Sequence, residues 1–358
     1  MFTPGIELNP IGRASRKRLA GRLLIFAALG ATVVVPILLG GKEALLATLH
    51  FSWRGYIGIF ALIVLSWLCR TFKLHVLLQR LHVRAGFGHL LGVSLATDFA
   101  FIATPGGLGG YAASIYYLRR TGASASAAAA VTAADQGLDV MFFVLALPCT
   151  GLSLIWSSVP QALSTLAFGT SALIALLTVG ALLTRHQLAK WLFGENFFTR
   201  RWPGLLRKQQ MLREFSAKLR AQGRLLLAGG SLFLLGTFVL TALQQLARYG
   251  VLWLVLLVLG HSVSFTLMFL LQVLVLQAAL WTGVPAGGGA AELGLTATLA
   301  AWVPAGNLAT ALLLWRVATL YFCLIAGAAA IGLLARRSTS SAKHGDIIQL
   351  DARGKNTD

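Results

Sequence analysis

The sequence predicts an all-α, polytopic integral membrane protein, and three observations lead to that prediction. The 358 residues are 57% hydrophobic, with a mean hydropathy of +0.77. Only 11% of them are charged, against about 25% in a soluble domain. The apolar residues form continuous runs, whereas strands of an outer-membrane barrel alternate with a period of two. We expect about six to eight transmembrane helices, plus two broken, re-entrant helix hairpins in inverted halves.

The apolar runs set the expected spans, because a bilayer core needs about 20 apolar residues per helix. The run from 249 to 283 is apolar throughout, so its crossings stay open. The first run follows a basic stretch and lacks a good cleavage site, so it predicts a retained helix rather than a signal peptide. The expected spans lie roughly at 20–40, 55–79, 123–147, 162–184, 225–247 and 307–334.

Lysine and arginine residues predict the topology. The formal net charge is +19, and most of the cationic residues lie in short segments between apolar runs. This distribution indicates the positive-inside bias of a membrane protein, so we expect no nucleic-acid partner. Both termini are then expected on the cytoplasmic side. On the same basis Arg70 and Lys73 end the second span and can snorkel to the interface, and Arg248 lies outside the membrane.

The predicted domain organisation follows from the same pattern. Residues 1–335 form one transmembrane domain, with pseudo-repeat halves at 20–184 and 225–335. The basic segment 185–224 connects the halves on the cytoplasmic side. The polar tail 336–358 is expected to be disordered.

Two matching interruptions lie inside the apolar sequence. Proline removes a backbone donor and glycine weakens a helix, and lipid-exposed backbone cannot leave such groups unpaired. Paired interruptions in two halves indicate a transport site at a repeat interface; the alternative is two ordinary surface loops. The first copy contains Pro105, Gly107 and Gly109, and the second contains Pro285, Gly287 and Gly289.

Several ionisable residues fall within predicted membrane segments. A charge at the bilayer centre costs about 2.5–3.5 kcal/mol on insertion scales, so these side chains should face one another or a wet cavity. The alternative to a functional cavity is a buried ion-pair cluster that only fixes helix packing. Together with the two interruptions, the candidate substrate-binding residues are Arg70, Asp98, Pro105, Gly107, Gly109, Asp135, Asp139, Pro285, Gly287, Gly289, Glu292 and Arg316.

Catalytic and metal-binding patterns are missing from the sequence. None of the seven histidines has a second histidine at i+4, and the three cysteines are scattered. The carboxylates Asp135 and Asp139 share a helix face, but no nucleophile or metal motif accompanies them. We therefore expect no enzymatic activity, no cofactor and no metal.

The same residues carry a resemblance to a known family. They are Arg70, Lys73 and Leu77-Leu78, the Pro105 glycine stretch, Asp135 and Asp139, Pro285-x-Gly-Gly-Gly with Glu292, and Arg316. Over most of residues 20–335 the chain resembles the flippase-like membrane region of lysylphosphatidylglycerol synthases and their stand-alone relatives. One departure is that relatives often place a glutamate after the first Gly pair, where this chain has Gly109-Gly110-Tyr111. That puts any role of the carboxylate in doubt, with Asp98 as a candidate substitute.

The resemblance implies an integral inner-membrane protein associated with moving lipid between leaflets. In the best-known members the cargo is aminoacylated phosphatidylglycerol, and a C-terminal cytosolic domain supplies aminoacyltransferase activity, which we expect this chain to lack. The expected partner is thus an anionic or aminoacylated phospholipid, or another lipid-linked substrate. The alternatives are a non-transporting accessory protein of a lipid- or glycan-synthesis enzyme, docked through 185–224, and a transferase acting on a lipid-linked donor. Cargo, direction, coupling ion and a homo-oligomeric state stay open.

Overall fold

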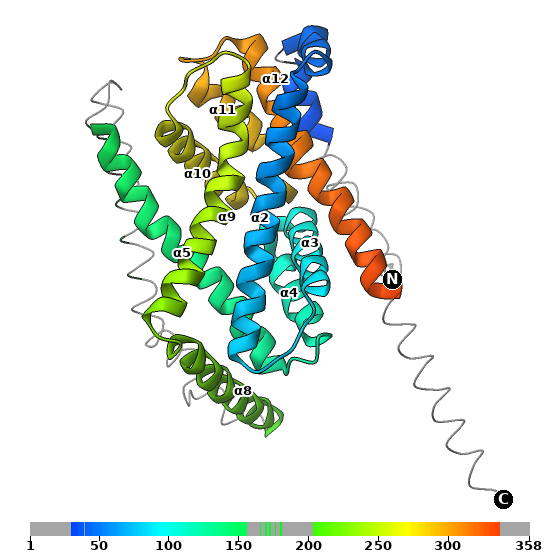
Figure 1. Ribbon diagram of the computed structural model, residues 1–358, viewed down its shortest axis with the longest axis vertical. Helices are drawn as coiled ribbons and strands as arrows, with labels where there is room; N and C mark the ends of the chain where they lie inside the picture. The colour runs from blue at the N-terminus through cyan, green and yellow to red at the C-terminus, as the bar shows by residue number, and fades with distance from the viewer. Residues whose placement is uncertain are drawn as a thin grey trace, which may run out of the picture.

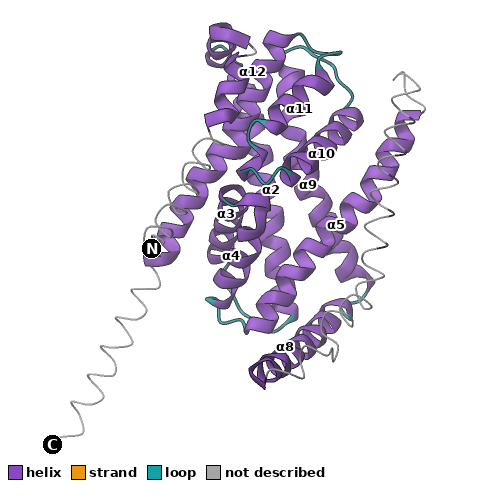
Figure 2. Cartoon of the chain, turned by 180° about the vertical axis from the view of Figure 1, so that it is seen from behind, coloured by secondary structure: helices purple, strands orange, loops and turns teal. Residues whose placement is uncertain are grey.

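The computed structural model describes residues 30–38, 40–155 and 203–336, with the isolated positions 165, 169, 172, 176 and 180. Three predictions fall wholly or largely outside these residues: the span at 162–184, residues 185–202 of the connector and the tail beyond residue 336. The first half of the expected span at 20–40 also lies outside them. Every regular element in the described residues is a helix (Figure 2), which confirms the predicted fold class.

The same order of elements occurs twice along the chain. A long helix is followed by a short helix, a three-residue break, a second short helix and another long helix. The first set is α2 (Trp53–Arg80), α3 (Phe87–Ala103), η1 (Pro105–Gly107), α4 (Leu108–Arg119) and α5 (Ala125–Ile155). The second set is α9 (Ser231–Val258), α10 (Phe265–Trp281), η2 (Pro285–Gly287), α11 (Ala290–Leu299) and α12 (Ala305–Arg316). A π-helical turn, η3 (Val317–Tyr321), continues α12, and α8 (Pro203–Leu227) precedes the second set.

Four described helices are long and apolar enough to cross a membrane: Trp53–Arg80, Ala125–Leu154, Ser231–Val258 and Ala305–Arg336. The last of these is α12 with its continuation through η3. The pair Gly30–Leu38 and Gly40–Leu49, bent by 109°, makes a fifth if it counts as one span. Helices α3 and α10 have 17 residues each. At 1.5 Å per residue they reach about 25 Å, short of a core about 30 Å thick.

The predicted boundaries around Arg248 are wrong. The helix expected at 225–247 begins at Ser231 and continues to Val258, so Arg248 lies inside it. It ends where Gly260 adopts φ +87°, a conformation that costs glycine little. The undivided run 249–283 is therefore the end of α9 followed by the first arm of the second hairpin.

The two hairpins approach each other from opposite ends of the molecule (Figures 1 and 2). Helices α2 and α9 pack side by side through the centre. The hairpin α3–η1–α4 lies in the lower half of Figure 1 and α10–η2–α11 in the upper half. The breaks η1 and η2 contact each other, and each also contacts the first arm of the opposite hairpin. Two helix breaks thus meet in the interior, as shielded broken backbone must.

The first hairpin packs closely against the last helix at Gly327. A Cβ placed there would lie 2.5 Å from Phe99 Cβ and 2.7 Å from the Leu95 carbonyl oxygen. Small residues permit such approaches between helices in lipid. Gly327 therefore fixes the spacing between α3 and the last helix.

We expect Gly327→Val to destabilise the protein by about 1–3 kcal/mol, because the backbone of α3 cannot yield to the added methyl groups. Thermal unfolding in detergent measures the change. Gly332→Val is the matched control, because a Cβ at Gly332 meets no atom within 4 Å. Equal stability of the two variants would contradict this packing.

Candidate functional site

Arg70 lies at the centre of a buried charged cluster. Its Nη1 donates to Asp98 Oδ1 at 2.5 Å, and its Nη2 donates to Asp135 Oδ2 at 3.1 Å. The arginine comes from α2, and the two carboxylates come from α3 and α5. All three side chains are almost fully buried. Arg70 thus joins three helices at a depth where an unpaired charge would be costly.

Lys73 adds a second cation on the same face of α2. Its Nζ lies 2.7 Å from Asp135 Oδ1 and 3.2 Å from Asp139 Oδ1. The expectation that Lys73 snorkels to the interface is wrong, because its side chain is 0% exposed. Helix α2 continues to Arg80, so Lys73 lies about two turns before the helix end. The two carboxylates of α5 compensate the buried ammonium group.

Arg248 brings the second half of the chain to the same cluster. Its Nη2 donates to Asp98 Oδ2 at 2.7 Å. Trp67 donates its indole N–H to the same oxygen at 3.2 Å, and its ring stacks on Phe322 with centroids 5.4 Å apart. The prediction that Arg248 lies outside the membrane is wrong for this reason. An arginine is tolerated within a span when a carboxylate pairs with it.

We call Arg70, Lys73, Asp98, Asp135, Asp139 and Arg248 the ionic cluster. Its three cations and three carboxylates balance, so pairing offsets the cost of removing each charge from water. Two of its side chains remain partly exposed: Asp139 by 17% and Arg248 by 41%. These two residues are the points where a solute could reach the cluster.

A separate ion pair lies at the second break. Glu292 is fully buried, and its Oε1 accepts a hydrogen bond from Arg316 Nε. Its Oε2 accepts the backbone N–H of Gly289 at 2.8 Å, which caps the first turn of α11. A carboxylate is favoured at a helix N-terminus by the helix dipole. Glu292 therefore occupies the position that an anionic ligand of α11 would take.

Arg316 keeps hydrogen-bonding capacity after pairing with Glu292. Its Nη1 donates to the Ala286 carbonyl at 3.3 Å, and its guanidinium lies over the Trp315 ring at 4.5 Å. Within the described residues its buried Nη2 has no hydrogen-bond partner. Ala286 has φ +56°, a strained conformation for a residue with a side chain. The second break thus combines strained backbone with a buried donor that remains available.

The first break is built without a carboxylate among its own residues. Gly107 has φ +72° and is the N-cap that precedes α4, and Thr104 Oγ1 accepts the N–H of Gly109 at 2.9 Å. The Phe101 ring packs directly on Gly110, so any side chain at Gly110 would overlap it. A glutamate therefore does not fit at Gly110 without moving Phe101. This packing accompanies the absence from this chain of the glutamate that relatives often have here.

The structure gathers the predicted site residues into three neighbouring groups. Arg70, Asp98, Asp135 and Asp139 belong to the ionic cluster. Glu292, Arg316 and Gly289 belong to the second ion pair, where Pro285 and Gly287 form the break. Pro105, Gly107 and Gly109 form or follow the first break, which contacts the second. The charged side chains pair with one another. The hydrated pocket expected between them remains a prediction.

The family model of the lysylphosphatidylglycerol synthase TM region matches residues 20–327. The chain belongs to this family. A UPF0104 membrane protein of Archaeoglobus fulgidus is 23% identical over 293 residues, covering 78% of this chain and 86% of that relative. The resemblance inferred from the residues is thus confirmed, and so is a membrane-embedded protein. In this member of the lysylphosphatidylglycerol synthase TM-region family, the matched segment contains both hairpins, the ionic cluster and the Glu292–Arg316 pair.

Sequence reasoning misses two members of the ionic cluster, Lys73 and Arg248, and the neighbouring Trp67 that donates to Asp98. Lys73 follows Arg70 at i+3, which places the two on one helix face. Arg248 lies within apolar sequence that continues on both sides of it. Both signals are weaker than the usual rule that a cation marks the end of a span. The contribution of Trp67 has no signal in the sequence.

Removing one buried member of the ionic cluster should be costly. Arg70→Met leaves Asp98 and Asp135 without their shared cation, and we expect a loss of about 3–5 kcal/mol. Arg248→Met should cost less, because Arg248 is 41% exposed and Arg70 keeps its bond to Asp98. Thermal unfolding in detergent compares the two substitutions. A larger effect at Arg248 would show that the cluster is not arranged as described.

Proposed function

We propose that the protein moves a phospholipid between the leaflets of the inner membrane, with both termini on the cytoplasmic side. The proposal rests on the contact between the two helix breaks, whose hairpins enter from opposite ends of the molecule. Buried charges lie beside these breaks. In secondary transporters, broken helices of this kind form the binding site at a repeat interface. The protein would transport the lipid without chemistry on it.

The repeated order of elements supports two halves related by inversion. Helices α2 and α9 have 28 residues each, α3 and α10 have 17 each, and each break has three. Arg70 and Arg248 occupy the same position in α2 and α9, and both bind Asp98. A pseudo-twofold axis passing near Asp98 would explain why one carboxylate serves both halves. Rocking of one half against the other would then expose the site alternately.

The Glu292–Arg316 pair supports a zwitterionic or anionic headgroup as cargo. A headgroup phosphate would compete with Glu292 for Arg316, whose planar guanidinium suits phosphate oxygens. An aminoacylated headgroup also carries an ammonium group, which would take over Glu292. The Glu292–Arg316 ion pair would thus be replaced by two ion pairs between protein and lipid, and no buried charge would be left unpaired. A purely anionic headgroup would instead leave Glu292 without a cationic partner.

A docking role is the second candidate, and α8 favours it. Lys218, Arg220 and Arg224 of this helix are exposed, and α8 lies at the lower end of the molecule in Figure 1. The protein would then be an accessory subunit of a lipid- or glycan-synthesis enzyme. Co-purification of such an enzyme that is lost on deleting 195–220, without lipid movement, would support this function over transport.

Transport is tested with the purified protein in liposomes that contain fluorescent phosphatidylglycerol or its aminoacylated form. The double substitution Glu292→Gln with Arg316→Gln removes both charges and leaves neither unpaired. We expect it to slow lipid movement at least about tenfold, because the headgroup loses its ionic partners. Quenching of outer-leaflet fluorescence measures the rate.

Glu43→Gln with Arg54→Gln is the matched control, because both side chains are exposed. It should leave the rate unchanged. Lipid movement at the parental rate in the Glu292 and Arg316 variant would remove this site from the mechanism. A parent protein that moves no lipid above empty liposomes would remove the transport proposal itself.

A further inference from the structure

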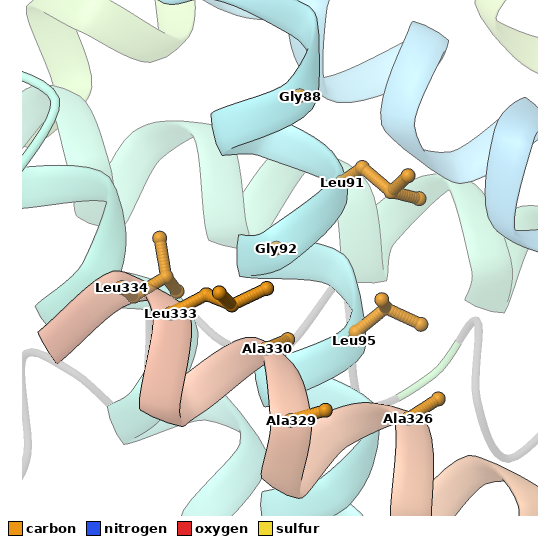
Figure 3. A pocket seen from close by; sticks show the side chains of 9 residues that line it. All are labelled: Gly88, Leu91, Gly92, Leu95, Ala326, Ala329, Ala330, Leu333 and Leu334. Atoms are coloured by element: carbon orange, nitrogen blue, oxygen red, sulfur yellow. The ribbon is translucent and has the colours of Figure 1, made fainter. Parts of the chain in front are cut away.

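We propose that a groove between α3 and the last helix binds an acyl chain of an anionic phospholipid, with the headgroup at the groove's basic end. This inference rests on the proposed function and names where its cargo would first dock. The groove has a volume of ≈ 250 Å³. It lies between residues 88–95 of α3 and residues 326–334 of the last helix (Figure 3).

The chemistry of the lining selects a hydrocarbon ligand. Every lining residue is Gly, Ala or Leu, and Figure 3 shows leucine side chains from both helices bordering the groove. A lining without polar side chains offers water few hydrogen-bond partners. Because both helices belong to a membrane protein, the hydrocarbon at hand is a lipid acyl chain.

The shape of the groove follows from the close packing at Gly327. Leu95 and Phe99 approach the last helix there within the distance that only glycine permits. Beyond that point the helices separate: a Cβ at Gly92 would meet only Leu334, at 3.3 Å, and a Cβ at Gly88 would meet no atom within 4 Å. The groove is therefore closed toward the middle of the molecule. A chain would enter from the end of α3 and extend inward.

Charge at the outer end selects the headgroup. Arg84 precedes α3, and Arg336 ends the last helix; both are exposed. They lie beyond the two outer ends of the lining, Gly88 and Leu334. Arginine is suited to phosphate oxygens, and basic residues beside a membrane attract anionic lipid. A phospholipid with its phosphate here would direct one chain along the groove toward Asp98, which follows Leu95 by one helical turn on α3.

The test uses phosphatidylglycerol with a photoreactive diazirine in its acyl chain, in liposomes containing the full-length protein. We expect cross-links to map to residues 88–95 and 326–334. Ala329→Phe fills the groove and should reduce this labelling at least about fivefold. Ala328→Phe is the matched control, because Ala328 is exposed and does not line the groove. It should label like the parent.

Two further arms make the result specific. Ala329→Leu, a smaller change, should give an intermediate loss and guards against misfolding of the Phe variant. A phosphatidylcholine probe with the same chain should label the groove less than phosphatidylglycerol does, and Arg84→Gln with Arg336→Gln should remove that difference. The basic end would then be the source of headgroup preference.

Several outcomes would overturn the inference. Labelling spread evenly over lipid-facing helices, or unchanged in Ala329→Phe, would mean that the groove holds no lipid. Residues 1–29 or a second copy of the chain could fill the groove instead of lipid. Protein–protein cross-links from position 329 would show such an occupant and overturn the inference. Labelling as expected without lipid movement would keep the groove and reject transport. Lipid movement at the parental rate in Ala329→Phe would keep transport and reject this groove as the place where the cargo first docks.

Discussion

Asp98 connects the two halves of the molecule. It accepts hydrogen bonds from Arg70 of α2 and from Arg248 of α9, two helices that pack side by side through the centre. A carboxylate in the membrane interior needs a cation, and each arginine needs a carboxylate. This mutual requirement fixes the rotation of both long helices and the depth of α3. Since α3 leads into the first break, it also places that break against the second.

The two breaks solve the same backbone problem with different side chains. At the second break, Glu292 caps α11 and holds Arg316, and strained Ala286 offers its carbonyl to the same arginine. At the first break, the Phe101 ring packs on Gly110 and Thr104 supplies the hydrogen bond to α4. One break is therefore polar and charged, and the other is apolar.

Much of the fold could be predicted because long apolar runs, Pro–Gly interruptions and positive connectors are local signals. The breaks at Pro105 and Pro285 lie where the sequence indicates them. The errors share one cause. The predictions for Lys73 and Arg248 both assume that a cation marks the interface. That assumption fails when a carboxylate from another helix pairs with the cation, and such pairing is a tertiary property. The exclusion of a side chain at Gly110 depends on Phe101, a contact that no spacing rule contains.

Contact between the two breaks in the membrane is the claim on which transport and the cluster geometry both depend. Cross-linking of Thr104→Cys to Val284→Cys, with Cys69, Cys149 and Cys323 replaced by serine, tests it directly. Mercuric ions, which bind two neighbouring thiolates at once, should join the two cysteines in membrane vesicles. Ser114→Cys with Thr132→Cys, whose native hydroxyls lie 2.9 Å apart between α4 and α5, reports that the reagent reaches the interior. Efficient cross-linking of that control pair, with none between residues 104 and 284, would contradict the account.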